Sequence, residues 1–352
     1  MDNTRKVFRE IKADAMLTES SDLRSYLTGF PSSFGFVYTD AQESTFFTDP
    51  RYAEGAKAAL KDSFIGVEIA KNFDMVLEYV KSKRVRNLAV PFERTTLPQL
   101  QKLKSYRFKL VDSMPAFVGA MAVKTENELS YIQKACKIAE QAYADILGKL
   151  KEGITENETA ALLEYLMRKY GAEDRSFETI AAFGENSSVP HHAPNDTKLR
   201  SGMPVLLDFG CRYRGYCSDI TRTVLFGKGD EAQDEFRRVY GLVYDAHMLA
   251  AEKISSGMTG KEADAIAREY LKTHGLDKFF THSLGHGIGI NIHEFPTLGP
   301  GGTGILQDGM VFSIEPGTYF EGKFGIRIED SVYLQGGKVA SLMKTDKKLT
   351  VL

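Results

Sequence analysis

The sequence lacks several features that would place it in a specialised class of protein. It has only three cysteines in 352 residues and no run of about 18 apolar residues, the length that a membrane crossing requires. The N-terminal residues have no apolar stretch like that of a secretion signal, and the cysteines form no CxxC pair. We therefore expect a cytoplasmic protein in a reducing environment. Cys211 and Cys217 flank an acidic hairpin, but buried free thiols explain them better than metal ligation.

The chain also has little net charge. It carries 45 lysines and arginines against 47 aspartates and glutamates, a formal charge of -2. No overall field attracts nucleic acid or an anionic membrane, so we expect neither partner. A small, uncharged substrate fits this balance better. With 352 residues and 43% hydrophobic content, the chain is long enough for two domains.

The first part of the chain, up to residue 122, reads as an α/β domain. Short apolar runs predict strands at residues 15–17, 34–38, 44–47, 67–70, 88–90 and 110–111. Helical stretches lie between them, near residues 51–61, 73–82 and 96–104. Nothing in this region resembles a catalytic site.

A capping box marks the start of the second domain. Thr125 and Glu128 have the spacing in which each side chain caps the other's backbone N–H, which predicts a long helix that reaches about Leu150. We therefore place the boundary near Val123, with one domain at residues 1–122 and the other at 123–352.

The second domain contains an internal repeat. Residues 202–210 read Gly-Met-Pro-Val-Leu-Leu-Asp-Phe-Gly and residues 309–317 read Gly-Met-Val-Phe-Ser-Ile-Glu-Pro-Gly, with an acid at the seventh place of each. A capping box and a closing glycine at residues 153–171 recur 104 residues later, at 257–275. A single match of this kind could arise by chance. Several matches at similar offsets make chance a poor explanation and favour a duplication.

Longer helices are expected before each capping box of the repeat, at residues 125–150 and 230–254. Each half then runs helix, helix and strands. We expect two copies of one α+β unit that face each other.

Each copy of the repeat carries two acids, Asp208 and Asp219 in the first and Glu315 and Glu329 in the second. The first pair belongs to a predicted hairpin that can place the two aspartates across from each other. A carboxylate after an apolar strand is costly to bury unless it meets a cation or lies at the strand's exposed end. Arg327 shares a strand face with Glu329, and two readings stay open: it orients Glu329 or a substrate, or it forms a structural salt bridge.

Histidines are concentrated near these acids. Five of the seven lie in two short segments, as His191, His192, His282, His286 and His293. His286 stands between two glycines and has room to approach a metal, whereas His282 and His293 could bind or protonate a substrate. The other two histidines fall in predicted helices and are interpreted as packing or surface residues.

The charges of the four acids indicate a site for two metals. Two divalent cations would neutralise four carboxylates and leave a bridging water free to ionise. One imidazole and mostly oxygen ligands favour manganese, cobalt or iron over a structural zinc, which prefers thiolates and histidines. Such a centre would hydrolyse an acyl bond.

These residues together resemble a known family, the M24 metallopeptidases that include Xaa-Pro dipeptidases (prolidases) and aminopeptidase P. The resemblance rests on the order and spacing of Asp208, Asp219, His286, Glu315 and Glu329, with His191, His282, His293 and Arg327. It covers nearly the whole chain, because residues 26–30 and 48–52 look like signatures of the family's N-terminal domain. It implies a creatinase-like α/β N-terminal domain and a pita-bread catalytic domain of two pseudo-symmetric α+β halves.

The resemblance also implies a role for each residue. The ligands of two manganese or cobalt ions, with iron or zinc as further candidates, would be Asp208, Asp219, His286, Glu315 and Glu329. Glu315 would also carry a proton to the prolyl nitrogen. His191 and His293 would hold the oxyanion or other substrate groups, His282 would line the proline pocket, and Arg327 would belong to the same catalytic set. Relatives are typically dimers, so we expect a homodimer.

The implied substrates are small peptides with proline at the second position, cut between the N-terminal residue and proline. The amide before proline has no N–H and a restricted preceding residue, so ordinary peptidases handle it poorly. Phe295 departs from the family pattern, in which glycine is common there, and this leaves open whether the enzyme is a dipeptidase or an aminopeptidase P. Two alternatives remain: a non-catalytic peptide-binding protein on the same fold, and a methionine aminopeptidase-like enzyme, which would lack the N-terminal domain.

Overall fold

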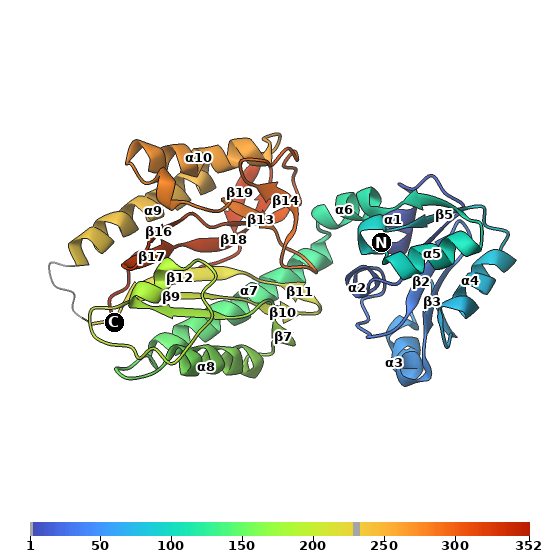
Figure 1. Cartoon of the computed structure of the whole chain (residues 1–352), viewed down its shortest axis with the longest axis horizontal. Coiled ribbons are helices and arrows are strands. Elements are labelled where there is room, and N and C mark those ends of the chain that lie inside the picture. The colour runs from blue at the N-terminus through green and yellow to red at the C-terminus, as the bar shows by residue number, and fades with distance from the viewer. Residues whose placement is uncertain (1–2, 228–232) are drawn as a thin grey trace. The chain divides into compact units, whose positions relative to one another are not determined.

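The computed structural model describes residues 3–227 and 233–352 of the chain. The chain divides into two compact units, Met1–Met121 and Ala122–Leu352, each built of helices and sheets (Figure 1). Among the described residues, none of the helices combines the length and the apolar composition needed to cross a membrane.

A six-stranded mixed sheet forms the centre of the first unit. Its order is β4-β3-β2-β1-β5-β6, with parallel pairs β3–β4, β1–β5 and β5–β6 and antiparallel pairs β1–β2 and β2–β3. The strands are β1 (Ala15–Thr18), β2 (Phe36–Asp40), β3 (Ser44–Thr48), β4 (Ile65–Ile69), β5 (Asn87–Val90) and β6 (Lys109–Asp112). Each predicted strand overlaps one of these, which confirms the α/β reading.

The helices of the first unit are α1 (Asn3–Phe8), α2 (Ser21–Thr28), α3 (Pro50–Leu60), α4 (Phe73–Ser82), α5 (Leu97–Ser105) and α6 (Met114–Ala122), with a 3₁₀ turn η1 (Phe92–Arg94). Local sequence explains where two of them begin. Asp49 caps α3 by accepting the N–H of Arg51, and Asn72 caps α4 by accepting the N–H of Met75. The sequence did not predict α6, because its residues are apolar on almost every side and show no helical period.

Two helix pairs belong to the second unit: α7 (Glu126–Leu147) with α8 (Glu156–Lys169), and α9 (Asp234–Lys253) with α10 (Gly260–Thr273). Capping boxes open α7, α8 and α10, as the sequence predicted. Residues 230–232 of the predicted helix 230–254 lie outside the described residues. In Figure 1 the pair α9 and α10 lies along one side of the sheet and the pair α7 and α8 along the other.

The main sheet of the second unit displays the internal repeat. Its order is β14-β13-β15-β18-β12-β9-β8, with β19 on β18. The strands are β8 (Ile180–Phe183), β9 (Pro204–Phe209), β12 (Ile220–Leu225), β13 (Gly285–Gly287), β14 (Glu294–Leu298), β15 (Val311–Ile314), β18 (Glu329–Gln335) and β19 (Lys338–Ser341). From the central pair β12 and β18, the sheet runs through β9 to β8 on one side and through β15 to β13 on the other. The two halves therefore mirror each other, with the two copies of the repeat on β9 and β15.

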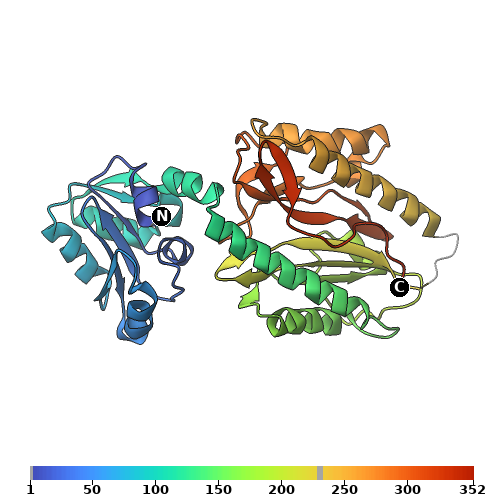
Figure 2. The same cartoon turned by 180° about the vertical axis from the view of Figure 1, so that it is seen from behind.

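Helices pack against the strands of this sheet. The helix α8 packs on β8, α10 packs on β14, and α9 packs on β15. Figure 2 shows α7 passing in front of the strands when the unit is seen from behind. Apolar side chains fill the space between helices and sheet, for example Phe236 and Val243 of α9 against Phe312 and Ile314 of β15, all at most 1% exposed.

Short elements complete the second unit. They are β7 (Asp174–Arg175), β10 (Cys211–Tyr213) and β11 (Tyr216–Cys217) in a three-stranded sheet, β16 (Gly317–Phe320) and β17 (Phe324–Arg327) in a hairpin, and the 3₁₀ turns η2 (Gly184–Ser188) and η4 (Asp277–Phe279).

Candidate metal centre

Strand register brings acids of both halves into one row. Thr221 of β12 lies opposite Asp208 of β9 on one side and opposite Glu329 of β18 on the other. Residues that pair across strands project from the same face of a sheet, so both acids point the same way as Thr221. Asp219 lies two residues before Thr221 and shares this face by alternation.

This register corrects one expectation. Asp208 lies opposite Thr221, so the prediction that the hairpin sets the two aspartates across from each other is wrong by two residues. The physical reason is the small hairpin of β10 and β11 inserted between the longer strands, where Arg214 and Gly215 turn the chain with φ of 52° and 79°. Both aspartates still belong to one cluster. Burial is the largest cause of the raised pKa of Asp219, followed by the charge of Glu329 and then by the charge of Asp208.

The second half supplies the other members through β15 and β13. The hydroxyl of Ser313 accepts the backbone N–H of His286 at 3.0 Å and donates to Glu315 Oε1 at 3.0 Å. His286 Nε2 then lies 3.3 Å from Glu315 Oε1 and 3.6 Å from Asp219 Oδ2. Ser313 therefore ties the backbone at one predicted ligand to the side chain of the next.

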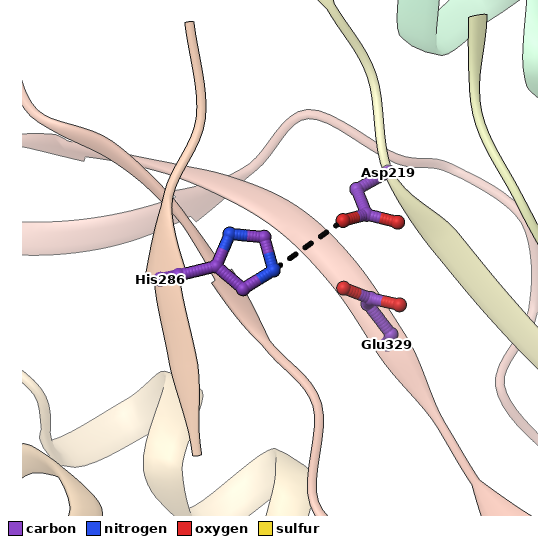
Figure 3. A group of neighbouring side chains, drawn as sticks. All are labelled: Asp219, His286 and Glu329. Carbon is purple, nitrogen blue, oxygen red and sulfur yellow. Dashed lines mark ion pairs between the residues drawn. The ribbon is translucent and has the colours of Figure 1, made fainter. Parts of the chain in front are cut away.

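Three of the predicted ligands converge most closely. Asp219, His286 and Glu329 each offer one atom, and these atoms lie within 4.8 Å of one another (Figure 3). They come from three segments that are far apart in sequence. Glu315 also contacts His286, and Asp208 lies opposite Thr221 on the neighbouring strand, paired with Arg327.

The polar atoms of this cluster fit divalent cations. Asp208 Oδ1 and Glu329 Oε1 are buried and have no hydrogen-bond partner among the residues that the structure describes. Burial raises the pKa of Asp219 well above its usual range, and the charges of Glu329 and Asp208 raise it further. Burial also raises the pKa of Glu315 to about 8. Buried carboxylate oxygens that lack partners are costly, and oxygen atoms of this kind are the usual ligands of hard cations.

Among the described residues, Arg327 supplies the positively charged side chain of this cluster. It forms an ion pair with Asp208, an acid of the first half of the repeat. Its guanidinium donates to Asp208 Oδ2, to Thr221 Oγ1 at 3.1 Å, and to the Tyr319 hydroxyl at 2.6 Å. The side chain of Arg327 is 4% exposed. The ion pair of Arg327 is thus made with Asp208, and the same arginine holds Thr221 and Tyr319 in place.

The ring of His282 is fixed at both nitrogens. Its Nδ1 lies 2.8 Å from the carbonyl oxygen of Ser283 and its Nε2 lies 2.8 Å from the Tyr319 hydroxyl. A carbonyl can only accept, so Nδ1 carries the proton and Nε2 accepts from Tyr319. Burial lowers the pKa of His282 to about 3, with Arg327 contributing, so the ring is neutral. Its carbon edge, rather than a nitrogen, is left to face a substrate.

The other two predicted substrate histidines lie near this cluster. The ring of His293 stands 4.2 Å from that of His286, centroid to centroid. Burial lowers the pKa of His293 to about 4, and the charges of His286 and His191 lower it further. His191 itself is exposed, yet its charge also acts on His282. His293 therefore lies beside a predicted ligand, and the charge of His191 affects the pKa of both other histidines.

Comparison with known proteins identifies both units. Residues 130–335 match the pattern of metallopeptidase family M24, and residues 1–118 match the creatinase/prolidase N-terminal domain. The chain belongs to metallopeptidase family M24.

Relatives of this M24 peptidase cover it almost end to end. It is 36% identical over 320 residues to the Xaa-Pro dipeptidase of Pyrococcus furiosus, an alignment that spans 91% of this chain and 90% of that protein. Its fold matches the Xaa-Pro dipeptidase from Bacillus anthracis with a TM-score of 0.93 at 32% identity, over 99% of this chain and 98% of the other. It matches the X-Pro aminopeptidase from Thermotoga maritima with a TM-score of 0.93 at 33% identity, over 100% of both chains. The chain is therefore a peptidase, and the predicted creatinase-like and pita-bread architecture is confirmed.

Phe295 of this M24 peptidase packs away from open space. A Cβ atom built on Gly304 would come within 2.2 Å of the Phe295 ring, so the ring covers that glycine. Phe295 also packs against the apolar core of the second half. Phe295, where the resemblance led us to expect a glycine, therefore packs on Gly304 and on the core.

The cysteines are interpreted as structural. All three are free and buried, and burial raises the pKa of Cys211 to about 12 and that of Cys217 to about 11. Protonated thiols at these positions are poor metal ligands.

Sequence reasoning missed Thr221, Ser313 and Tyr319, which hold the predicted site residues in place. The hydroxyl of Thr221 donates to Glu329 Oε2 at 2.6 Å while it accepts from Arg327. Each of the three lies in a strand, within a few residues of a predicted ligand. Hydroxyl side chains on the same face as the acids were the available signal.

Proposed function

We propose that this M24 peptidase uses two divalent metal ions to cleave the bond between an N-terminal residue and proline, as an Xaa-Pro dipeptidase or an aminopeptidase P. One observation carries the proposal: acids from both halves of the sheet meet a single imidazole, and two buried carboxylate oxygens there have no hydrogen-bond partner in the described part of the chain. The names of the relatives in Pyrococcus furiosus, Bacillus anthracis and Thermotoga maritima support the proline specificity.

The proposed ligands are Asp208, Asp219, His286, Glu315 and Glu329. Their four negative charges exceed the single positive charge of Arg327 by three, which two divalent cations more than offset. Four carboxylates and one imidazole favour manganese or cobalt, with iron or zinc as alternatives. The chemistry that such ions supply is polarisation of a carbonyl and activation of water near neutral pH.

The chain's own residues would then direct the reaction. Glu315 lies beside His286, with 3.3 Å between Glu315 Oε1 and His286 Nε2, and its ionised carboxylate would take up a proton and deliver it to the prolyl nitrogen. His293 and His191 are the imidazoles available to donate hydrogen bonds to the oxyanion or to other groups of the substrate. The carbon edge of His282 would form a wall of the proline pocket, because both of its nitrogens are engaged.

The N-terminal domain and the full set of ligand residues argue against the two alternative functions. A methionine aminopeptidase-like enzyme would lack the N-terminal domain that residues 1–118 match. A non-catalytic peptide-binding protein would be expected to have lost ligand residues, whereas all five are present in this sequence. Small peptides with proline at the second position are the substrates we propose, and a cytoplasmic homodimer remains a prediction.

Metal analysis and three peptides test the proposal. The purified chain should bind two equivalents of manganese or cobalt, measured by elemental analysis after dialysis. It should hydrolyse Ala-Pro or Ala-Pro-Ala in the presence of manganese and leave Ala-Ala uncut. The ratio of the rates on the first two peptides decides between dipeptidase and aminopeptidase P.

A matched histidine variant provides the control. His286→Ala should lose metal and activity, whereas His274→Ala should keep both, because His274 is exposed and bonds to Thr273 and Tyr270 of the adjoining helix. Full activity in His286→Ala, or cleavage of Ala-Ala as fast as Ala-Pro, would refute the proposed function.

A further inference from the structure

Glu156 is a buried acid outside the candidate metal centre. It is the first residue of α8 and is 0% exposed, although acids in the first turn of a helix usually face solvent. Nothing in the proposed reaction uses this side chain. Its burial therefore requires another explanation.

Four hydrogen bonds satisfy the Glu156 carboxylate, and all four come from residues 183–195. Oε1 accepts from the backbone N–H of Phe183 at 2.7 Å and from Asn186 Nδ2 at 2.9 Å. Oε2 accepts from His192 Nε2 at 2.7 Å and from the backbone N–H of Asn195 at 3.1 Å. One carboxylate thus binds both ends and the middle of a segment that runs from the last residue of β8 through η2 into a loop.

That segment contains His191 and is bonded to Arg327 of the site. His191 directly precedes His192, which Glu156 holds, and follows Pro190, whose carbonyl accepts from Arg327 at 3.4 Å. The segment is therefore attached on one side to the guanidinium that binds Asp208 and on the other side to Glu156. His191 lies between the two attachments and is itself exposed.

We propose that Glu156 is a positioning residue that fixes the 183–195 segment and so places the His191 imidazole for the substrate. The inference rests on the proposed function, in which His191 contacts substrate. A carboxylate suits this task, because it accepts from four donors without offering a hydrogen that would repel one of them. Its place at the N-terminus of α8 further stabilises the charge.

The other half of the domain shows that this feature is particular to the first half. The residue that corresponds to Glu156 in the repeat, 104 positions later, is Gly260. Gly260 likewise begins its helix, but it packs directly against the backbone of Thr297 and has no side chain to hold a segment. The acid therefore belongs to the one half that carries His191.

A double-mutant cycle on the metal-loaded full chain tests whether Glu156 acts through His191. In Glu156→Gln, an amide NH₂ replaces one carboxylate oxygen and would face N–H donors of residues 183–195. Two donors cannot bond to each other, so this segment should loosen. We expect kcat/KM for an Xaa-Pro peptide to fall by about 10- to 100-fold, the range seen when a binding group is displaced by about 1 Å. In a His191→Ala background the same change should cost less than about twofold, because the group that it positions is gone.

Two further variants guard against misfolding and generic destabilisation. His192→Ala removes one of the four donors and should give a smaller loss with the same dependence on His191. Glu158→Gln is the matched control: it is the same substitution in the same helix, but Glu158 is exposed and bonds to Thr155 of its own capping box. It should leave kcat/KM unchanged.

Amide hydrogen exchange gives a readout that does not depend on activity. Exchange in peptides that cover residues 183–195 should accelerate in Glu156→Gln and not in Glu158→Gln. Unchanged exchange there, or an equal loss of kcat/KM with and without His191, would overturn the inference. Failure of the unmodified chain to cleave any Xaa-Pro peptide would instead refute the proposed function, and the exchange result would still decide whether Glu156 holds the segment.

Discussion

Replacing Asp219 by asparagine should make the metal-free protein more stable while removing its response to metal. Asp219 is buried among three other acids, and an atom of Glu329 lies within 4.8 Å of one of its ligand atoms. Two charges at that separation repel by about 3 kcal/mol at an effective dielectric constant of 20. Proton uptake relieves part of this repulsion, so we expect Asp219→Asn to gain about 1 to 3 kcal/mol in free energy of unfolding without metal.

Metal should reverse the order of the two proteins. One ion that binds only the folded state at a hundredfold excess over its Kd adds about 2.7 kcal/mol, and two such ions add about 5 kcal/mol. For a unit the size of residues 122–352, each kcal/mol shifts Tm by about 2 to 4 °C. Manganese should therefore raise the Tm of the unmodified chain by about 10 to 20 °C and leave Asp219→Asn nearly unchanged.

Thermal unfolding in chelator and in excess manganese measures both effects. Asp277→Asn, an exposed aspartate of the same unit, is the matched control and should respond to manganese like the unmodified chain. If Asp219→Asn melts below the unmodified chain in chelator, the four acids do not repel one another as described. If manganese stabilises both proteins equally, Asp219 is not a ligand.

Two further predictions concern groups that support the site and the core. Thr221→Val removes the hydroxyl that donates to Glu329 and accepts from Arg327. It should weaken manganese binding by about 10- to 100-fold in a calorimetric titration. Unchanged affinity would show that Thr221 does not orient Glu329. Burial lowers the pKa of His247 from 6.5 to about 4, so the unfolded chain takes up a proton there as the pH falls while the folded chain excludes it. The stability that neutral His247 contributes is complete above pH 6.5 and is lost toward pH 4, by about 2 kcal/mol at pH 5. Urea unfolding at pH 7 and pH 5 should show this loss in the unmodified chain and a smaller one in His247→Gln; an equal loss in both would contradict the assignment.

Sequence patterns predicted the parts of the fold that local chemistry determines. Capping boxes set the starts of α7, α8 and α10, and apolar runs located the strands of the first unit. The repeat predicted two similar halves, and the mirrored strand order of the main sheet confirms them. In each case the deciding residues are close together in the chain.

Pairing between distant segments could not be predicted in the same way. Nothing in the sequence shows that Asp208 pairs with Thr221 rather than Asp219, because the register depends on how the β10–β11 hairpin folds. Glu156 looks like an ordinary first-turn acid, and its burial depends on donors 27 to 39 residues away. Arg327 was placed beside Glu329 by alternation along its strand, yet its ion pair is with Asp208, 119 residues away.

The start of α10 should not tolerate a side chain in place of its glycine. Gly260 begins α10, and a Cβ atom there would lie 1.9 Å from the backbone oxygen of Thr297, which pairs with His286 across β14 and β13. Gly260→Ala should therefore push α10 from β14, lower the free energy of unfolding by about 1 to 3 kcal/mol and weaken manganese binding through His286.

Gly241, inside α9, is the matched control for this change. A Cβ atom there meets nothing within 4 Å, so Gly241→Ala should raise stability by up to about 1 kcal/mol through helix propensity alone. Urea unfolding and a manganese titration on both variants distinguish the effects. Equal stabilisation by the two alanines would mean that α10 can move from β14 without disturbing the candidate ligand, and that the tight contact at Gly260 does not help to position His286.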